Sequence, residues 1–246
     1  MLNSAVIKLS GEAIGCHESD SGYNEAVIAD ITKQIKQVVQ AGTQVSLVIG
    51  GGNYWRGRQA NSEMDRVKAD QMGMLATVMN ALYLADAFRR IEQKSKVITP
   101  IPIGNITTLY AKDSAQEMLN DGIVLINAAG LGHPMFSTDT VTVLRAAELE
   151  ADCVFFAKNT DGVYSADPRK NTNAKKFRTL SYQYAISNGL NVADMTALSL
   201  AQDANIDSYV FALNKKDSIA LACSNFQSEK LHGTYISVSA KEDYYE

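Results

Sequence analysis

The sequence predicts an α/β fold in which a mostly parallel β-sheet is covered by helices on both faces, a three-layer sandwich. Short apolar runs recur along the chain, helical patterns separate most of them, and glycine-rich or polar turns follow several of the runs. The predicted strands are Ala5–Leu9, Val45–Ile49, Ile123–Asn127, Cys153–Ala157 and Tyr209–Leu213. Because strands that alternate with helices usually pair in parallel and bury both sheet faces, this order favours a central sheet between two helical layers.

Apolar periodicity defines the helical segments. Between the first two strands, apolar residues recur at helical spacing at Val27, Ile31, Ile35 and Val38. Gly42 follows them as the natural stop. The segment Asp65–Glu92 is a longer helical pattern, rich in Met, Leu and Ala and poor in charge at its middle. Core packing explains part of this apolar character, and a subunit interface is our interpretation of the rest. A further helical pattern covers Val141–Leu149.

Composition limits the class of protein. The 246 residues are 46% hydrophobic with four prolines, which fits one large α/β domain or two closely joined lobes. A net charge of -4 without a Lys/Arg stripe argues against nucleic acid as a general partner, although nucleotides remain possible. We expect a cytoplasmic protein that does not cross a membrane, since we find neither a secretory leader nor a run of about 18 apolar residues. The scattered thiols and imidazoles do not have metal-site spacing; they are Cys16, Cys153, Cys223, His17, His133 and His232.

The stretch Val48–Gly57 carries the first functional signal. An apolar strand runs directly into three glycines, and Arg56 follows within four residues. Backbone without Cβ atoms lets a phosphate approach main-chain N–H groups closely, and a guanidinium fork suits phosphate oxygens. A tight turn after a buried strand is the alternative for the glycines alone.

Lys8 is embedded in the first apolar strand, which ends in the small residues Ser10 and Gly11. A lysine is costly to bury unless an anion meets it, so Lys8 is a candidate phosphate ligand. A solvated lysine on an edge strand is the alternative. Neither loop is a Walker A motif, because no Gly-Lys pair occurs, and Gly130–Gly132 lacks the later glycine of the dinucleotide fingerprint.

Two further loops follow strands in the second half of the chain. Ala128–Thr140 contains glycines and hydroxyls and precedes a helix, which predicts an anion site at the positive helix end. A plain N-cap at Thr138 or Asp139 is the alternative. Lys158–Pro168 lies at the carboxyl end of a strand, where ligands bind in open α/β sheets, although its Asp-Gly and Asp-Pro pairs are also ordinary turn residues. Four such loops at successive strand ends indicate one ligand site.

On these residues the chain resembles the bacterial uridylate (UMP) kinases of the amino acid kinase superfamily, over essentially its full length. The matching blocks, in the family's order, are Lys8–Ala13, Gly50–Asn53 with Arg56–Gly57, Asp70 with Met72–Thr77, Phe136–Thr140, and Asp161–Tyr164 with Ala166–Pro168. The block from Asp70 to Thr77 discriminates most, because relatives acting on carbamate or amino acids share the glycine loops but not that helix. The chain departs from many members at His133, Met135 and Ala193.

The resemblance implies the amino acid kinase fold as a single domain over residues 1–246, with the acceptor side mainly in 1–150 and the ATP side mainly in 151–246. It implies transfer of the γ-phosphoryl group of ATP to UMP, with Mg²⁺ accompanying ATP and no separate metal site. The implied catalytic residues are Lys8, Arg56, Asp139 and Asp194. The implied ATP ligands are Lys8, Ser10, Gly11, Gly52, Arg56, Asn159, Tyr164 and Asp167. The implied UMP ligands are Gly51, Asp70, Leu131, Gly132, His133, Pro134, Met135, Phe136, Ser137 and Thr138.

Particular roles are also implied by the resemblance. Asp70 would accept hydrogen bonds from the ribose hydroxyls of UMP. Asp139 and Asp194 would lie near the transferring phosphate and orient Lys8 and Mg²⁺-bound water. Two rival functions are a related kinase of another small acceptor and a non-catalytic nucleotide-binding protein of the same fold.

The resemblance further implies a homo-oligomer, usually a hexamer built from dimers that pack through the long helix, and inhibition by UTP at the UMP site. Many relatives are activated by GTP at a site that uses cations near the end of that helix. Here the segment Thr99–Asp121 contains Lys112 as its only cation, with four more upstream at Arg89, Arg90, Lys94 and Lys96. Because a triphosphate needs several cations or N–H donors, we predict weak or absent GTP activation. The alternative is that the upstream cations suffice.

Overall fold

The structure is a computed structural model that describes residues 2–16, 22–55, 63–226 and 232–245. The catalytic candidate Arg56 lies outside the described residues, as does His17. Among the described residues, no helix is both long enough and apolar enough to cross a bilayer.

One sheet contains all ten strands found in the described residues, in the order β10-β7-β9-β8-β6-β1-β2-β5-β3-β4. The strands are β1 Ser4–Leu9, β2 Gln44–Ile49, β3 Ser95–Thr99, β4 Thr108–Leu109, β5 Val124–Asn127, β6 Cys153–Lys158, β7 Phe177–Ser181, β8 Asp207–Ala212, β9 Thr234–Ser237 and β10 Asp243–Tyr244. The central strands all pair in parallel, and the antiparallel pairs are β8 with β9 and β7 with β10. The carboxyl ends of the central strands therefore meet at one edge of the sheet.

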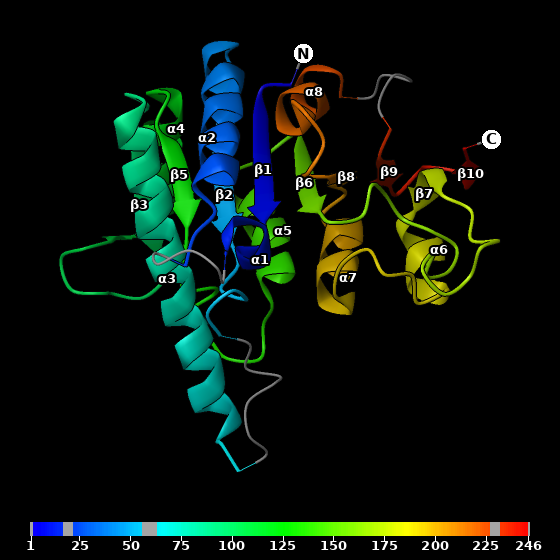
Figure 1. Cartoon of the computed structure of the whole chain (residues 1–246), viewed down its shortest axis with the longest axis horizontal. Coiled ribbons are helices and arrows are strands. Elements are labelled where there is room, and N and C mark those ends of the chain that lie inside the picture. The colour runs from blue at the N-terminus through cyan, green and yellow to red at the C-terminus, as the bar shows by residue number, and fades with distance from the viewer. Residues whose placement is uncertain (1, 17–21, 56–62, 227–231, 246) are drawn as a thin grey trace.

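Helices cover both faces of this sheet (Figure 1). They are α1 Gly11–Ile14, α2 Glu25–Gln40, α3 Arg66–Arg90, α4 Lys112–Asn120, α5 Thr138–Glu148, α6 Tyr182–Ser187, α7 Met195–Asp203 and α8 Ser218–Ser224. The core that contains buried residues of α2, α3 and α8 lies on one face, and the core of α5, α6 and α7 lies on the other. α4 packs on β5 through a smaller cluster. The predicted three-layer α/β sandwich is confirmed.

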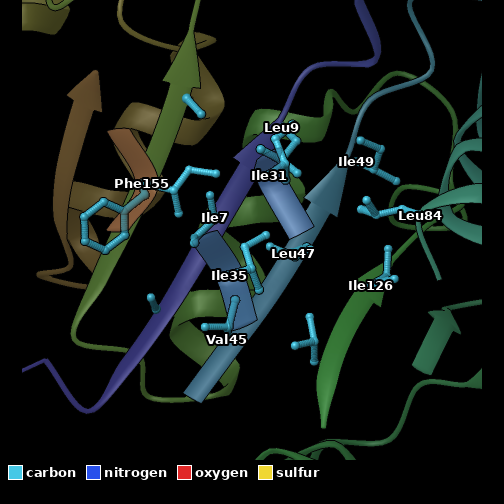
Figure 2. Packing of buried hydrophobic residues seen from close by; sticks show 14 of the residues in the cluster. Ile7, Leu9, Ile31, Ile35, Val45, Leu47, Ile49, Leu84, Ile126 and Phe155 are labelled. Carbon is cyan, nitrogen blue, oxygen red and sulfur yellow. The ribbon is translucent and has the colours of Figure 1, made fainter. Parts of the chain in front are cut away.

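Strand alternation separates the two cores. In β1, Ile7 and Leu9 face α2, whereas Val6 belongs to the core under α5. Figure 2 shows Ile31 and Ile35 of α2 above β1 and β2. Full burial of an aliphatic side chain contributes roughly 1.5–3 kcal/mol, so this layer accounts for much of the driving force for folding. Lys8 follows Ile7 and therefore extends toward α5, on the face where Asp139 lies.

All five predicted strands are in the sheet, with boundaries shifted by one or two residues, while β3, β4, β7, β9 and β10 were not predicted. Among the unpredicted strands, β4 and β10 have two residues each and lie at the sheet edges, β3 and β9 begin with polar residues, and β7 is only partly buried. The long predicted helix Asp65–Glu92 is α3, with Asp65 as its N-cap. In Figure 1, α3 extends past the edge of the sheet at which β1 and β6 end.

Candidate active site

The first two predicted phosphate loops touch each other at the carboxyl edge of the sheet. Leu9 and Ile49 are paired in the parallel register of β1 and β2, so the residues that follow them are neighbours. A Cβ atom added to Gly11 would lie 2.6 Å from Gly50 O and 2.8 Å from Gly52 N. Such distances are sterically forbidden, so glycine at position 11 is required for the two loops to meet.

The same loops are fixed by helix contacts. Ser10 caps α1, its side chain accepting from Ala13 N at 3.3 Å. Gly51 rests directly on α3, because an added Cβ would lie 2.9 Å from both Gly73 O and the Ala76 methyl group. Gly51 and Gly52 therefore lie between the β1 loop and α3.

Lys8, which lies in β1 just before its loop, forms an ion pair with Asp139 of α5. The Lys8 ammonium lies 3.1 Å from Asp139 Oδ1, and the two side chains are only 14% and 17% exposed. Asp139 occupies the first turn of α5, where the helix dipole favours negative charge. Asp139 Oδ1 is buried and accepts no well-aligned hydrogen bond from the described residues, so its attraction to Lys8 is mainly electrostatic.

Asp194 joins α5 to α7. Its carboxylate caps α7 by accepting from Ala197 N at 3.0 Å, and it also accepts hydrogen bonds from the hydroxyls of Ser137 and Thr140. Ser137 is itself the N-cap of α5. Asp194 thus fixes the N-terminus of α5, and with it Asp139, from the neighbouring helix.

Lys158 adds a second buried cation. It ends β6 beside β1, and its ammonium donates to Val192 O. Burial lowers the pKa of Lys158, and repulsion from Lys8 acts in the same direction, while Asp139 opposes both effects. Two buried lysines thus lie near one carboxylate, and this excess of positive charge favours the binding of an anion.

A cavity of about 460 Å³ opens beside Asp139. Its lining residues are Arg66, Asp70, Met135, Phe136, Ser137, Asp139, Lys158, Asn191, Ala193 and Asp194. A smaller cavity of about 160 Å³ shares Asp70 and Phe136 with it and is lined also by Gly51, Gly130, His133 and Thr138. Asp70, the glycine loop and the loop before α5 therefore surround two adjoining cavities, the larger of which extends from Asp70 to Asp139.

Asp70 is 16% exposed and links two sides of this region. Its Oδ1 accepts from Arg66 Nε at 3.0 Å, and its Oδ2 accepts from Met135 N at 2.9 Å. Met135 has a positive φ of 73° and is 62% exposed, as is typical of a loop held in place by specific contacts rather than by burial. Asp70 is one of those contacts.

The family model of the amino acid kinase family matches residues 3–212. The chain belongs to this family. Among solved structures, it is similar to the UMP kinase from Bacillus anthracis, with 33% identity, 100% of this chain and 99% of that chain covered, and a TM-score of 0.92. It is also similar to the UMP kinase from Ureaplasma parvum, with 34% identity, 96% of this chain and 99% of that chain covered, and a TM-score of 0.88. For the uridylate kinase from Archaeoglobus fulgidus the identity is 27%, the coverage is 96% of this chain and 100% of that chain, and the TM-score is 0.67.

Most of the sequence-predicted acceptor residues of this amino acid kinase lie around the two joined cavities. Pro134 and Leu131 line neither of them, although both belong to the same loop before α5. A Cβ on Gly132 would lie 2.7 Å from Ile101, so this glycine packs against the segment after β3. The loop thus reaches the cavities through His133 and 135–138, with Ser137 and Thr138 at the helix start, whereas Gly132 lines neither cavity.

The residues predicted to surround adenosine do not all line one cavity. Tyr164 and Asp167 line a separate cavity of about 230 Å³. Asn159 is exposed and lines none of the cavities described here. The Tyr164 hydroxyl donates to Asp161 at 2.8 Å, and burial together with this carboxylate raises the pKa of Tyr164 to about 12. Asp167 forms an ion pair with Arg169.

Some residues of the site were not predicted. Lys158, Arg66 and Asn191 line the main cavity, and Thr140 binds Asp194. Lys158 could have been found, because it directly follows an apolar run, and a lysine within an apolar strand is the signal that identified Lys8. A further cavity of about 480 Å³ beside the end of β8 contains no predicted site residue; Lys215 and Lys216 are among those lining it.

Proposed function

We propose that this amino acid kinase transfers the γ-phosphoryl group of ATP to UMP, giving ADP and UDP for pyrimidine nucleotide synthesis. The observation that carries the proposal is the larger cavity, which joins Asp70 to Asp139 and its partner Lys8. It lies at the carboxyl edge of a parallel sheet, in a chain that is 33% and 34% identical to two UMP kinases over nearly their full lengths.

The chemistry needs no general base. A phosphate monoester such as UMP has its second pKa near about 6, so the attacking oxygen is already ionised at neutral pH. Catalysis then consists of holding donor and acceptor phosphates in line and stabilising charge on the equatorial oxygens. In this proposal Lys8, Lys158 and the N–H groups of the two glycine loops supply that stabilisation. Arg56, which is not among the described residues, would supply a further cation.

Asp139 has the environment of a residue that organises cations. It pairs with Lys8 and contributes to the charge around Lys158. Its buried Oδ1 without an aligned hydrogen bond fits Mg²⁺, which kinases hold through one or two carboxylates together with substrate phosphates. Bound with ATP, Mg²⁺ would neutralise charge on the phosphates. Asp194 is occupied by three protein donors and would act by positioning α5.

The acceptor nucleotide would occupy the joined cavities, with its phosphate toward Asp139 and its ribose toward Asp70. The Mg²⁺-ATP complex would approach over the two glycine loops. UTP carries the same uridine group as UMP. We therefore propose that UTP inhibits the reaction by competing with UMP for the acceptor site.

The proposal is tested by measuring ADP release from ATP over a panel of nucleoside monophosphates and small carboxylate or carbamate acceptors. UMP should give the highest kcat/KM. A different preferred acceptor would identify the related-kinase alternative. ATP binding without turnover on any acceptor would identify the nucleotide-binding alternative.

We also propose that the protein assembles through α3. The helix exposes an apolar stripe at Met72 (41%), Leu75 (55%), Met79 (52%) and Leu82 (38%). These residues recur at three- to four-residue spacing, which places them on one face, and a closed assembly of even order would cover it. Sedimentation should show such an oligomer, and Leu75→Glu should dissociate it. Val238→Glu, at a position 45% exposed elsewhere, is the control. A stable, active monomer at micromolar concentration would overturn this prediction.

GTP should activate the enzyme weakly or not at all. Three of the five cations that could bind it already have carboxylate partners: Arg89 and Arg90 pair with Asp86, and Lys112 pairs with Glu150 at 2.9 Å. A triphosphate would have to compete with these ion pairs. We expect less than about fivefold activation by millimolar GTP at subsaturating ATP, which corresponds to less than about 1 kcal/mol of coupling. Initial rates with and without GTP measure it, and larger activation contradicts the prediction.

A further inference from the structure

The glycine loops are tied to α3 by a buried amide pair that the chemistry above does not use. Asn80 is 0% exposed although it lies in the middle of α3. Its Nδ2 donates to Gly50 O at 2.7 Å and to Asn53 Oδ1 at 2.8 Å. In return, Asn53 Nδ2 donates to Asn80 Oδ1 at 3.1 Å. A buried amide with all of these bonds satisfied has one orientation, so Asn80 holds Asn53 in one position.

Asn53 lies between the two loops. A Cβ added to Gly11 would be 2.5 Å from Asn53 Oδ1, and one added to Gly15 would be 2.6 Å from Asn53 Cβ. The asparagine side chain therefore packs against the β1 loop and α1 while its own backbone belongs to the β2 loop. This side chain therefore fills the space between the two loops, which are also joined where Gly50 N donates to Leu9 O at 2.9 Å.

The acceptor loop is tied to the same face of α3. Thr77 lies one helical turn before Asn80, and its Oγ1 accepts from Ala129 N at 2.7 Å. Ala129 has a positive φ of 59° at the start of the loop that leads to α5. One helix face thus sets the positions of the loop assigned to ATP and of the loop assigned to UMP.

We propose that Asn80, acting through Asn53, is a positioning residue for phosphoryl transfer. This inference rests on the proposed function of the same site. Asn80 lines none of the cavities described above, so it contacts the loops and not the substrates. Its loss should let the two glycine loops shift relative to each other, which misaligns the donor phosphate without removing any group that binds it.

The kinetic test uses Asn80→Ala, Asn53→Ala and the double variant. Each single variant should lower kcat by about 10²-fold, the effect of a displacement of about 1 Å, with KM for ATP and UMP changed much less. The double variant should be no slower than either single variant, because the two amides act as a unit. Asn80→Asp keeps the shape but sets an oxygen against Gly50 O and Asn53 Oδ1, so it should be as slow as Asn80→Ala.

Gln34→Ala is the matched control. Gln34 is 1% exposed and ties α2 to α8 through bonds to Ile219 N and Ala220 N, away from the glycine loops. It should lower the melting temperature as Asn80→Ala does but leave kcat unchanged. If folded Asn80→Ala keeps kcat within about twofold of the wild type, or if the effects of the single variants multiply in the double variant, the positioning role is wrong.

A second readout is independent of turnover. The chain has one tryptophan, Trp55, which follows the β2 loop and donates from Nε1 to Ala69 O of α3 at 2.7 Å. Acrylamide quenching of Trp55 fluorescence without nucleotide should increase in Asn80→Ala and stay unchanged in Gln34→Ala; equal quenching in both would overturn the loop displacement. If the wild type phosphorylates no nucleoside monophosphate while quenching still separates the two variants, the proposed function fails and the positioning of the loops stands.

Discussion

Lys8→Met should lower kcat for UDP formation by about 10²–10³-fold and leave the fold intact, the typical loss when one preorganised electrostatic contact to a transition state is removed. Methionine preserves most of the apolar stem in β1 but removes the ammonium that faces Asp139 at 3.1 Å. The charge on the transferring phosphoryl group would then lose one of its two buried cations. Initial rates at saturating ATP and UMP measure the effect, with a thermal melt to verify folding.

Two further variants separate the role of Lys8 from simple charge balance. Asp139→Asn alone should also be slow, because the carboxylate organises the cations around the phosphates. If Lys8 served only to neutralise Asp139, the double variant would recover activity; we expect it to remain slow. Lys36→Met is a matched control, since the Lys36 ammonium is partly buried against Ile91 O at 2.5 Å, away from the site. Full activity in Lys8→Met would exclude Lys8 from the mechanism.

Asp70→Ala should raise KM for UMP at least about tenfold, equivalent to about 1.4 kcal/mol, while KM for ATP changes little. Asp70 lines both cavities, and we propose that its carboxylate accepts hydrogen bonds from the ribose hydroxyls of UMP. It also holds Met135 N, so its removal loosens the acceptor loop as well. Steady-state kinetics with each substrate varied in turn measure the two constants.

Deoxy analogues of UMP distinguish these two contributions. If Asp70 binds the ribose, the wild type should prefer UMP over its 2′-deoxy or 3′-deoxy analogue, and Asp70→Ala should lose that preference. If Asp70 only anchors the loop, the variant should weaken UMP and both analogues equally. Arg66→Ala removes the other partner of Asp70 at 3.0 Å but keeps the carboxylate, so it should retain the preference. Equal KM values for UMP in wild type and Asp70→Ala would refute both roles.

The centre of the fold was predictable from the sequence because its signals are local. The apolar runs at β1, β2, β5, β6 and β8 are buried on both faces, so each is recognisable without knowledge of its neighbours. β4 and β10 are two-residue strands defined only by pairing with a partner strand, which no local pattern reveals. α3 was predicted over its full length, with one residue too many at its start and two at its end, because its helical pattern is also a local signal.

From the sequence alone, the residue types of the site could be identified: glycines after β1 and β2, Lys8 in β1, Asp70 in α3 and Asp139 in α5, each in a short recognisable block. Which of these residues meet depends on the three-dimensional fold. Lys8 and Asp139 are far apart in the chain, and they pair because β1 directs Lys8 to the face that α5 covers. Asn80 looked like an ordinary polar residue of a helix, and its burial against Gly50 depends on how α3 packs beside β2. Hydrogen bonds and ion pairs act over a few ångströms of space, and the fold, not sequence spacing, sets those distances.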